Sequence, residues 1–366
     1  MVKLSMRQKT INKKFLWLMF SFIDYAHSNI IPSSEQNFQP YKLKVIFLTL
    51  VEIRIKLFFM YNKTMEGKGL NNLTKNIESN QYEKIGPTAW AVSYQRSLAD
   101  IKYAKEIFEE LITLIESSSE KDREYFEKAK SSKTTAQLEA RFKLINKILK
   151  EYNPKKILEI AAGLSPRGLA MAEENSDLEY VEVDLPNMAI EKSKILRDLE
   201  EKNIGTPKNL QVIAGDALDL ETLLVATKNI KLGSFAVVNE GLLRYLKFEE
   251  KKKVAENVKD LLKRFGGIWI TPDITTHKAI VSTTKGAEYQ RIKDLAGIDI
   301  DANSFRDEQH AREFFQELGF EIESHRYSEV ENDLVAPQKA GMTKDEIHDT
   351  IAATTPVFVM RIKSSE

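Results

Sequence analysis

After Pro154 the sequence alternates short apolar segments with amphipathic segments, and this alternation restricts the fold more than any other feature. We expect strands at 156–160, 178–183, 210–214, 235–239, 268–271, 320–326 and 357–362. Helical periodicity between them, as at 186–202 and 248–264, is typical of strands joined by helical crossovers. The pattern therefore predicts an α/β fold, a Rossmann-like doubly wound sheet that is mostly parallel, with an antiparallel last strand. Such sheets bind ligands beyond the carboxyl ends of their strands.

Acidic and small residues follow the first two expected strands. Glu159 closes the first strand, and Ala161 and Gly163 form a small-residue turn that lets the backbone approach a ligand. Asp184, followed by Leu185, ends the second strand, where a carboxylate can accept both hydroxyls of a ribose. Taken singly, these features also fit a tight strand–helix connection and an acid that caps the following helix.

The third and fourth strands end in polar residues as well. Asp216 is placed to accept from an adenine amino group and the Ala217 amide to donate to a ring nitrogen, although Asp216 also fits a plain helix N-cap. Asn239 and Glu240 end the fourth strand, where we expect both to face the cleft. Four such strand ends in one chain favour a nucleoside site over coincidence.

These residues resemble class I S-adenosylmethionine-dependent methyltransferases, and more closely the leucine carboxyl methyltransferase-like branch, which includes polyketide-type O-methyltransferases. The matching stretches are Ala161-Ala-Gly-Leu-Ser-Pro-Arg167, Glu182-Val-Asp-Leu-Pro186, Glu240-Gly-Leu-Leu-Arg-Tyr-Leu246 and the helical Thr88-Ala-Trp-Ala-Val-Ser-Tyr-Gln-Arg-Ser97. The resemblance covers about 85–362. Ala161 and Ser165 depart from it, because the family has Gly and Asp at these positions.

The resemblance implies that S-adenosylmethionine is the cofactor. Its ribose would lie on Asp184, its adenine on Asp216 and Ala217, its methionine portion on Gly163, its carboxylate on Arg96, and its amino group or sulfonium near Glu240. A planar guanidinium suits a carboxylate, although a helix-surface arginine is an equally open interpretation of Arg96.

The implied reaction is in-line methyl transfer, and we expect O-methylation of a small-molecule carboxylate or hydroxyl. A carboxylate is ionised at pH 7 and needs no base, whereas a hydroxyl would benefit from one. His277 and Tyr245 are the catalytic candidates, against a solvated loop histidine and a packed aromatic. The segments 274–304 and 328–355, together with the N-terminal helices, are expected to enclose the acceptor.

The sequence also bears on other acceptors, ligands and activities. A protein C-terminal carboxylate remains a possible acceptor. Nucleic acid is not expected, since Lys+Arg and Asp+Glu are both 54. A nicotinamide-dependent Rossmann oxidoreductase would require G-x-G-x-x-G, which the first turn lacks. A non-catalytic nucleoside-binding or scaffold protein fits the departures at Ala161 and Ser165. No metal site is expected from a chain with no Cys and five His.

The chain divides by composition into three parts. Residues 1–64 are basic and aromatic-rich, with ten Lys/Arg, three Asp/Glu and no Gly, which indicates a misplaced start codon or a membrane-associating segment. Residues 65–152 are expected to form a helical N-terminal cap, and 153–366 the cofactor-binding domain. We expect a cytoplasmic protein, peripheral to the membrane if 1–64 is native.

Overall fold

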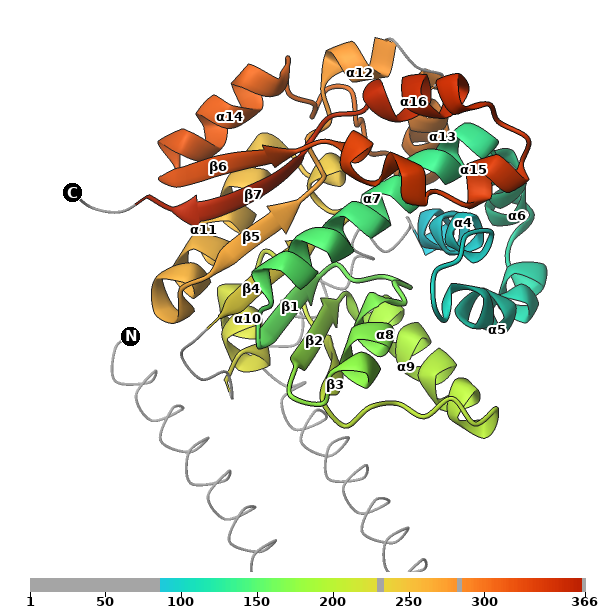
Figure 1. The fold of residues 1–366 in the computed structure, drawn as a ribbon, viewed down its shortest axis with the longest axis horizontal. Coiled ribbons are helices and arrows are strands. Elements are labelled where there is room, and N and C mark those ends of the chain that lie inside the picture. The colour runs from blue at the N-terminus through green and yellow to red at the C-terminus, as the bar shows by residue number, and fades with distance from the viewer. Residues whose placement is uncertain (1–85, 229–233, 282–284, 364–366) are drawn as a thin grey trace, which may run out of the picture. The chain divides into compact units, whose positions relative to one another are not determined.

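The computed structural model describes residues 86–228, 234–281 and 285–363, so the 1–64 extension and the start of the predicted cap lie outside the described residues. Within these segments seven strands form one sheet, in the order β3-β2-β1-β4-β5-β7-β6 (Figure 1). The strands are β1 (Lys156–Ile160), β2 (Glu179–Asp184), β3 (Leu210–Ala214), β4 (Phe235–Asn239), β5 (Ile268–Thr271), β6 (Phe320–His325) and β7 (Val357–Ile362). β7 runs antiparallel to β5 and β6, and the other pairings are parallel. The predicted fold class is confirmed.

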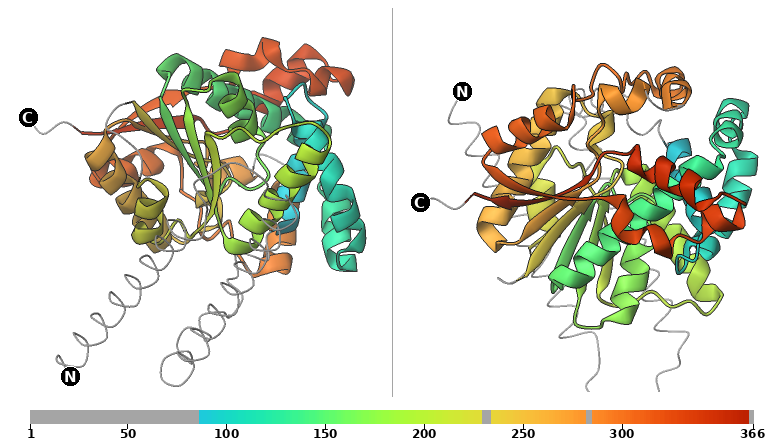
Figure 2. Two further views of the ribbon diagram at one scale, coloured as in Figure 1. Left: turned by 90° about the horizontal axis from the view of Figure 1, so that it is seen from below. Right: turned by 45° about the horizontal axis from the view of Figure 1, so that its top comes forward.

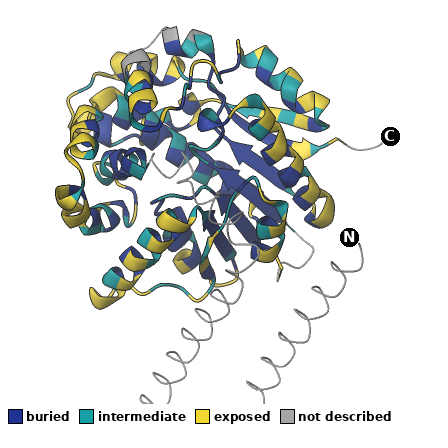
Figure 3. Ribbon diagram, turned by 180° about the vertical axis from the view of Figure 1, so that it is seen from behind, coloured by how far each residue is buried: buried dark blue, intermediate teal, exposed yellow. Residues whose placement is uncertain are grey.

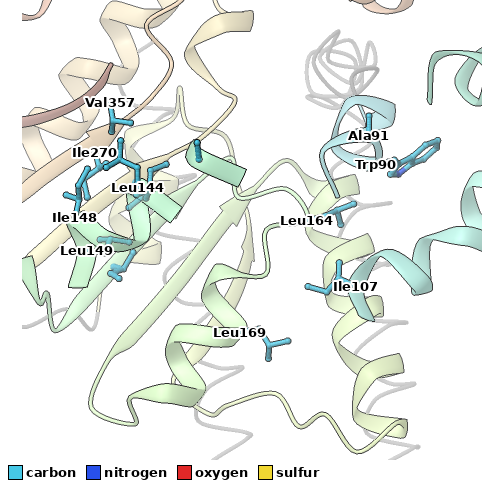
Figure 4. Close-up of a cluster of buried hydrophobic side chains, with 14 of the residues drawn as sticks. Trp90, Ala91, Ile107, Leu144, Ile148, Leu149, Leu164, Leu169, Ile270 and Val357 are labelled. Atoms are coloured by element: carbon cyan, nitrogen blue, oxygen red, sulfur yellow. The ribbon is translucent and has the colours of Figure 1, made fainter. Parts of the chain in front are cut away.

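The central strands are buried along their whole length because helices cover both faces of the sheet (Figures 2 and 3). All five residues of β1 and of β4 are buried. Alternate residues enter two separate cores: Ile157 packs with α7 (Ser132–Tyr152), α8 (Arg167–Glu174) and α9 (Pro186–Glu201), whereas Leu158 faces the opposite side. Figure 4 shows part of the first core, where Leu144, Ile148 and Leu149 of α7 lie beside Ile270 and Val357.

The second core is closed by α10 (Leu220–Ala226), α11 (Phe248–Phe265) and α14 (Glu308–Glu317). Gly267 precedes β5 with φ of 102°, and a Cβ there would lie 1.9 Å from the carbonyl oxygen of Phe235. Only glycine therefore permits β4 and β5 to approach as they do.

The N-terminal helices are α4 (Gly86–Ser97), α5 (Ala104–Ser117) and α6 (Glu120–Lys128), and they agree with the helical periodicity of the cap. α5 buries Ala104, Ile107, Leu111 and Ile115, one residue per turn, and it packs against α4 and α9. α4 thereby lies beside the first strand–helix turn of the sheet, where its residues share a cavity with that turn.

Short helices occupy the two segments expected to enclose the acceptor. The first contains α12 (His277–Val281) and α13 (Lys285–Ala296), and the second contains η3 (Tyr327–Asp333), α15 (Ala336–Lys339) and α16 (Lys344–Ala352). Segment 328–355 is thus mostly helical. Its last helix, α16, begins at a capping box formed by Thr343 and Glu346. The Glu139 carboxylate also accepts from the amides of Val335 and Ala336, at 2.8 and 2.9 Å. No helix in the described segments is long and apolar enough to cross a membrane.

Candidate functional site

A cavity of about 530 Å3 lies at the carboxyl ends of β1, β2, β3 and β4, beside α4. Nine of the ten residues proposed to bind the cofactor line it: Arg96, Glu159, Ala161, Gly163, Asp184, Leu185, Asp216, Ala217 and Glu240. The strand-end residues Glu159, Asp184, Asp216 and Glu240 thus share one cavity, and Arg96 reaches it from α4, 144 positions from Glu240.

The turn after β1 is fixed by the acid at the end of β2. Asp184 accepts from the Gly163 amide through Oδ2 at 2.6 Å and from the Leu185 amide through Oδ1 at 2.7 Å. Burial raises the pKa of Asp184 to about 6, although these two hydrogen bonds favour the ionised form. Ala161 and Gly163 have φ of 54° and 53°, so the turn needs the left-handed region twice, once at a residue with a side chain.

The turn after β3 is held in the same way by backbone contacts. Asp216 accepts from the Leu218 amide at 2.9 Å, and Asn257 of α11 donates to the Ala217 carbonyl oxygen at 2.9 Å. These two bonds place the Asp216 carboxylate and the Ala217 backbone at one end of the cavity.

The opposite end of the cavity contains a cluster of charged side chains around Glu240. Arg141 Nε lies 2.7 Å from Glu240 Oε1, Arg167 Nη2 lies 2.7 Å from Oε2, and Arg96 pairs with Oε1. Burial opposes ionisation of Glu240, but Arg96, Arg141 and Arg167 together hold its pKa well below the usual range. Arg167 also pairs with Glu159, whose second oxygen accepts from the Tyr180 hydroxyl at 2.6 Å.

This cluster, Arg96, Arg141, Arg167, Glu159 and Glu240, has three guanidinium groups and two carboxylates. It therefore carries one uncompensated positive charge in a buried site. Arg96 is only 5% exposed, and within the described part of the chain its buried Nε has no hydrogen-bond partner. Arg96 is thus no helix-surface residue, and an anion in the cavity would satisfy both the charge and the free donor.

Asn239 is the one predicted cofactor residue that does not line the cavity. It is 0% exposed, its Nδ2 donates to Asp273 at 2.8 Å, and its Oδ1 accepts from Trp269 Nε1 at 2.7 Å. Both polar atoms are therefore used inside the protein. Successive side chains of a strand point to opposite faces of the sheet. The Asn239 side chain lies on the face toward Trp269 and Asp273 and not toward the cavity.

Asp273, which follows β5, is a site residue that sequence reasoning missed. Its carboxylate accepts from the amides of Gly241, Leu242 and Leu243 at 2.9, 2.7 and 3.0 Å. It thus fixes the loop that presents Glu240 and leads into η2 (Leu243–Tyr245). The signal was an acid just beyond a fifth strand end, to which the strand-end rule applies equally.

The two catalytic candidates lie in different environments. His277 begins α12, is about half exposed, and its Nδ1 lies 2.7 Å from Asp301 Oδ1; it does not line the cavity. Tyr245 lines it, and its hydroxyl lies 3.4 Å from Thr88 Oγ1. Burial raises the pKa of Tyr245, so its phenol stays protonated at neutral pH and is a donor rather than a base.

The doubly wound sheet with its antiparallel β7 agrees with the fold that the resemblance to class I S-adenosylmethionine-dependent methyltransferases implies, and the cavity lies beyond its strand ends. Residues 84–259 match the family model of leucine carboxyl methyltransferase, and over this part the chain is similar to that family. A comparison with curated proteins gives no match.

Solved structures provide more distant likenesses. A Nostoc punctiforme protein assigned as an O-methyltransferase is 15% identical, with a TM-score of 0.39 over 63% of this chain and 60% of that one. The O-methyltransferase NcsB1 from neocarzinostatin biosynthesis, solved with S-adenosylmethionine and 2-hydroxy-5-methyl naphthoic acid, is 12% identical, with a TM-score of 0.36 over 58% and 50%. The methyltransferase domain of bacterial CtHen1 is 10% identical, with a TM-score of 0.40 over 62% and 98%. The chain thus spans 60% of the length of the first of these proteins and 50% of the second.

Proposed function

We propose that this protein is an enzyme that transfers the methyl group of S-adenosylmethionine to an oxygen atom of a small molecule, either a carboxylate or a hydroxyl. The observation that carries the proposal is the pairing of two unlike ends in one cavity. Asp184 and Asp216 offer acceptors at one end, and the arginine cluster around Glu240 has an unmatched positive charge at the other. S-adenosylmethionine matches both ends, because its adenosine has hydroxyl and amino donors and its amino-acid part has a negatively charged carboxylate.

Each residue would act through its own chemistry. Asp184 would accept from the ribose hydroxyls, and Asp216 with the Ala217 amide would hold the adenine edge. Arg96 would donate its free Nε and the rest of its guanidinium to the carboxylate of the methionine portion. Glu240 is engaged by three arginines, so its part is to position Arg96 and Arg141 rather than to bind alone.

Catalysis would then rest on alignment and on exclusion of water. The cofactor supplies an already activated methyl group, so the protein has to orient the acceptor oxygen in line with it. Tyr245 and Thr88, on η2 and α4, stand at the border of the cavity where an acceptor would arrive. An acceptor that is already ionised fits best, because neither Tyr245 nor the exposed His277 offers a base inside the cavity.

The test is calorimetric binding of S-adenosylmethionine and of NAD, followed by turnover with small carboxylic acids, phenols and peptides ending in a free carboxylate. We expect S-adenosylmethionine to bind, and S-adenosylhomocysteine to form with at least one of the small molecules. Binding without turnover in any of these would favour a nucleoside sensor or scaffold instead. Turnover with peptides alone would identify a protein C-terminal carboxylate as the acceptor. Tight binding of NAD without binding of S-adenosylmethionine would contradict the proposal.

A further inference from the structure

A second cavity, of about 280 Å3, adjoins the first. Five residues line both: Thr88, Val92, Arg141, Arg244 and Tyr245. Tyr245 and Thr88 are joined across this border by their hydroxyl groups. Direct transfer requires the two reacting atoms to come within about 3–3.5 Å of each other. An acceptor in the second cavity would therefore have to reach the first cavity past the residues at this border.

The second cavity has buried cationic groups that the protein itself does not satisfy. The Nε atoms of Arg244, on η2, and of Arg291, on α13, are both buried and have no hydrogen-bond partner among the described residues. Arg244 Nη2 makes one long contact, 3.4 Å, to the Tyr289 hydroxyl. Among the described residues that line this cavity, the only carboxylate is Glu288, against Arg244 and Arg291, since Lys128 pairs with Glu124. The lining is therefore positively charged even when Arg141 is assigned to Glu240.

Four tyrosines also belong to the lining. Tyr125, Tyr245, Tyr289 and Tyr327 all line the second cavity and are all buried. Burial raises the pKa of each phenol, so all four are neutral donors at physiological pH. Their rings also offer flat apolar surface. A wall of guanidinium and phenol donors calls for a ligand rich in acceptor oxygens, attached to a flat apolar body.

We propose that the second cavity is the acceptor site, and that Arg244 and Arg291 select an acceptor that carries a carboxylate on a small ring system. This assignment rests on the proposed function and narrows its substrate class to organic acids. Arg244 stands at the border with the first cavity, so the ionised carboxylate that it orients there is itself the methyl acceptor, and Arg291, which lines only the second cavity, adds positive charge behind it. The carboxylate oxygen would bond to the methyl carbon as the sulfonium S–C bond breaks, giving a methyl ester and S-adenosylhomocysteine. The guanidinium forks match a carboxylate in geometry as well as in charge.

The experiment compares benzoate with benzamide, its uncharged counterpart of nearly equal shape. Both are titrated by ligand-observed NMR into the full chain saturated with S-adenosylhomocysteine. We expect benzoate to bind at least tenfold more tightly than benzamide. Arg291→Gln should remove most of this preference and leave the affinity for S-adenosylhomocysteine, measured by calorimetry, unchanged. Arg264→Gln, an exposed arginine on α11 that lines neither cavity, is the matched control and should behave as the parent.

The outcomes separate this assignment from the function on which it rests. Normal binding of S-adenosylhomocysteine without any preference for benzoate, or with a preference that Arg291→Gln leaves intact, overturns the acceptor site alone. Failure of the parent chain to bind S-adenosylhomocysteine overturns the proposed function. If Arg291→Gln does not fold, judged by its melting temperature, Arg244→Lys serves instead, since it keeps the charge, loses the fork and should reduce the preference.

Discussion

The two ends of the first cavity are built by different means. At the end with Asp184 and Asp216, backbone amides hold both acids. The Leu185 and Leu218 amides are within three residues of the acids that they bind, and the Gly163 amide belongs to the adjoining turn after β1. At the end with Glu240, the partners are side chains from α4, α7 and α8, which are 73 to 144 residues away. One end is a property of strand–turn segments, and the other exists only after the helices have packed.

This difference has an energetic side. Backbone amides are part of the fold, so removing Asp184 leaves donors that water or a ligand can reach in an open cavity. Removing one member of the arginine cluster around Glu240 instead leaves buried charges without a counter-ion. We therefore expect the Asp184 end to respond to mutation mainly in cofactor affinity, and the Glu240 end mainly in stability.

The largest effect should come from Glu240→Gln. Three guanidinium groups would lose their shared carboxylate, and the free energy of unfolding should fall by about 3–5 kcal/mol, the range for breaking a buried ion pair. Chemical denaturation of the unliganded protein measures it. Glu249→Gln, an exposed glutamate at the start of α11, is the control and should change stability by less than about 0.5 kcal/mol. A loss of similar size in both variants would contradict the arginine cluster as a buried unit.

Asp184→Ala should affect binding more than folding. The loss of charge-assisted hydrogen bonds to ribose hydroxyls should weaken S-adenosylmethionine by about 1.5–3 kcal/mol, measured by calorimetry on protein whose melting temperature is checked. Asp177→Ala, at an exposed aspartate just before β2, should leave the affinity unchanged. Unaltered binding by a folded Asp184→Ala protein would remove Asp184 from the ribose role.

The pH dependence of binding sharpens the same point. Burial raises the pKa of Asp184 in the folded protein to about 6, from a reference value of 3.8. Protonation of Asp184 therefore stabilises the fold below about pH 4, and this stabilisation is lost as the pH rises through 6. Accepting two hydroxyls requires the ionised form, so affinity should fall about tenfold between pH 7.5 and pH 5, where about a tenth of the carboxylate is ionised. Asp184→Asn should bind more weakly and without this step. The same step in Asp184→Asn would assign it to another group, such as Glu182, whose pKa burial raises to about 7.

The same contrast explains what the sequence could predict. Periodicity identified all seven strands to within a residue or so at each end. The central strands β1, β4 and β5 are short runs buried on both faces, whereas the edge strands β3 and β6 are partly exposed. The strand-end rule found Asp184, Asp216 and Glu240, since each belongs to its own strand. It could not find that Arg141 and Arg167 converge on Glu240, because nothing in a helix sequence specifies which distant carboxylate its arginines meet. The prediction that Asn239 faces the cleft was wrong for a related reason, since Trp269 and Asp273 determine where its side chain lies.

The smallest effect is expected at the turn after β1, where the Asp184 end of the cavity stores backbone strain. Ala161 has φ of 54°, a conformation that costs an L-residue about 1–2 kcal/mol and glycine almost nothing. Ala161→Gly should therefore raise the free energy of unfolding by about 1 kcal/mol, after the added freedom of the unfolded chain is subtracted. Its methyl group also lines the cavity, so S-adenosylmethionine should bind at least as tightly as before. Ala162→Gly is a matched control one residue along, buried and without a positive φ, and it should lower stability by about 0.5–1 kcal/mol. Chemical denaturation of the two variants should thus give opposite signs, and equal destabilisation of both would mean that the turn relaxes around Ala161 without strain.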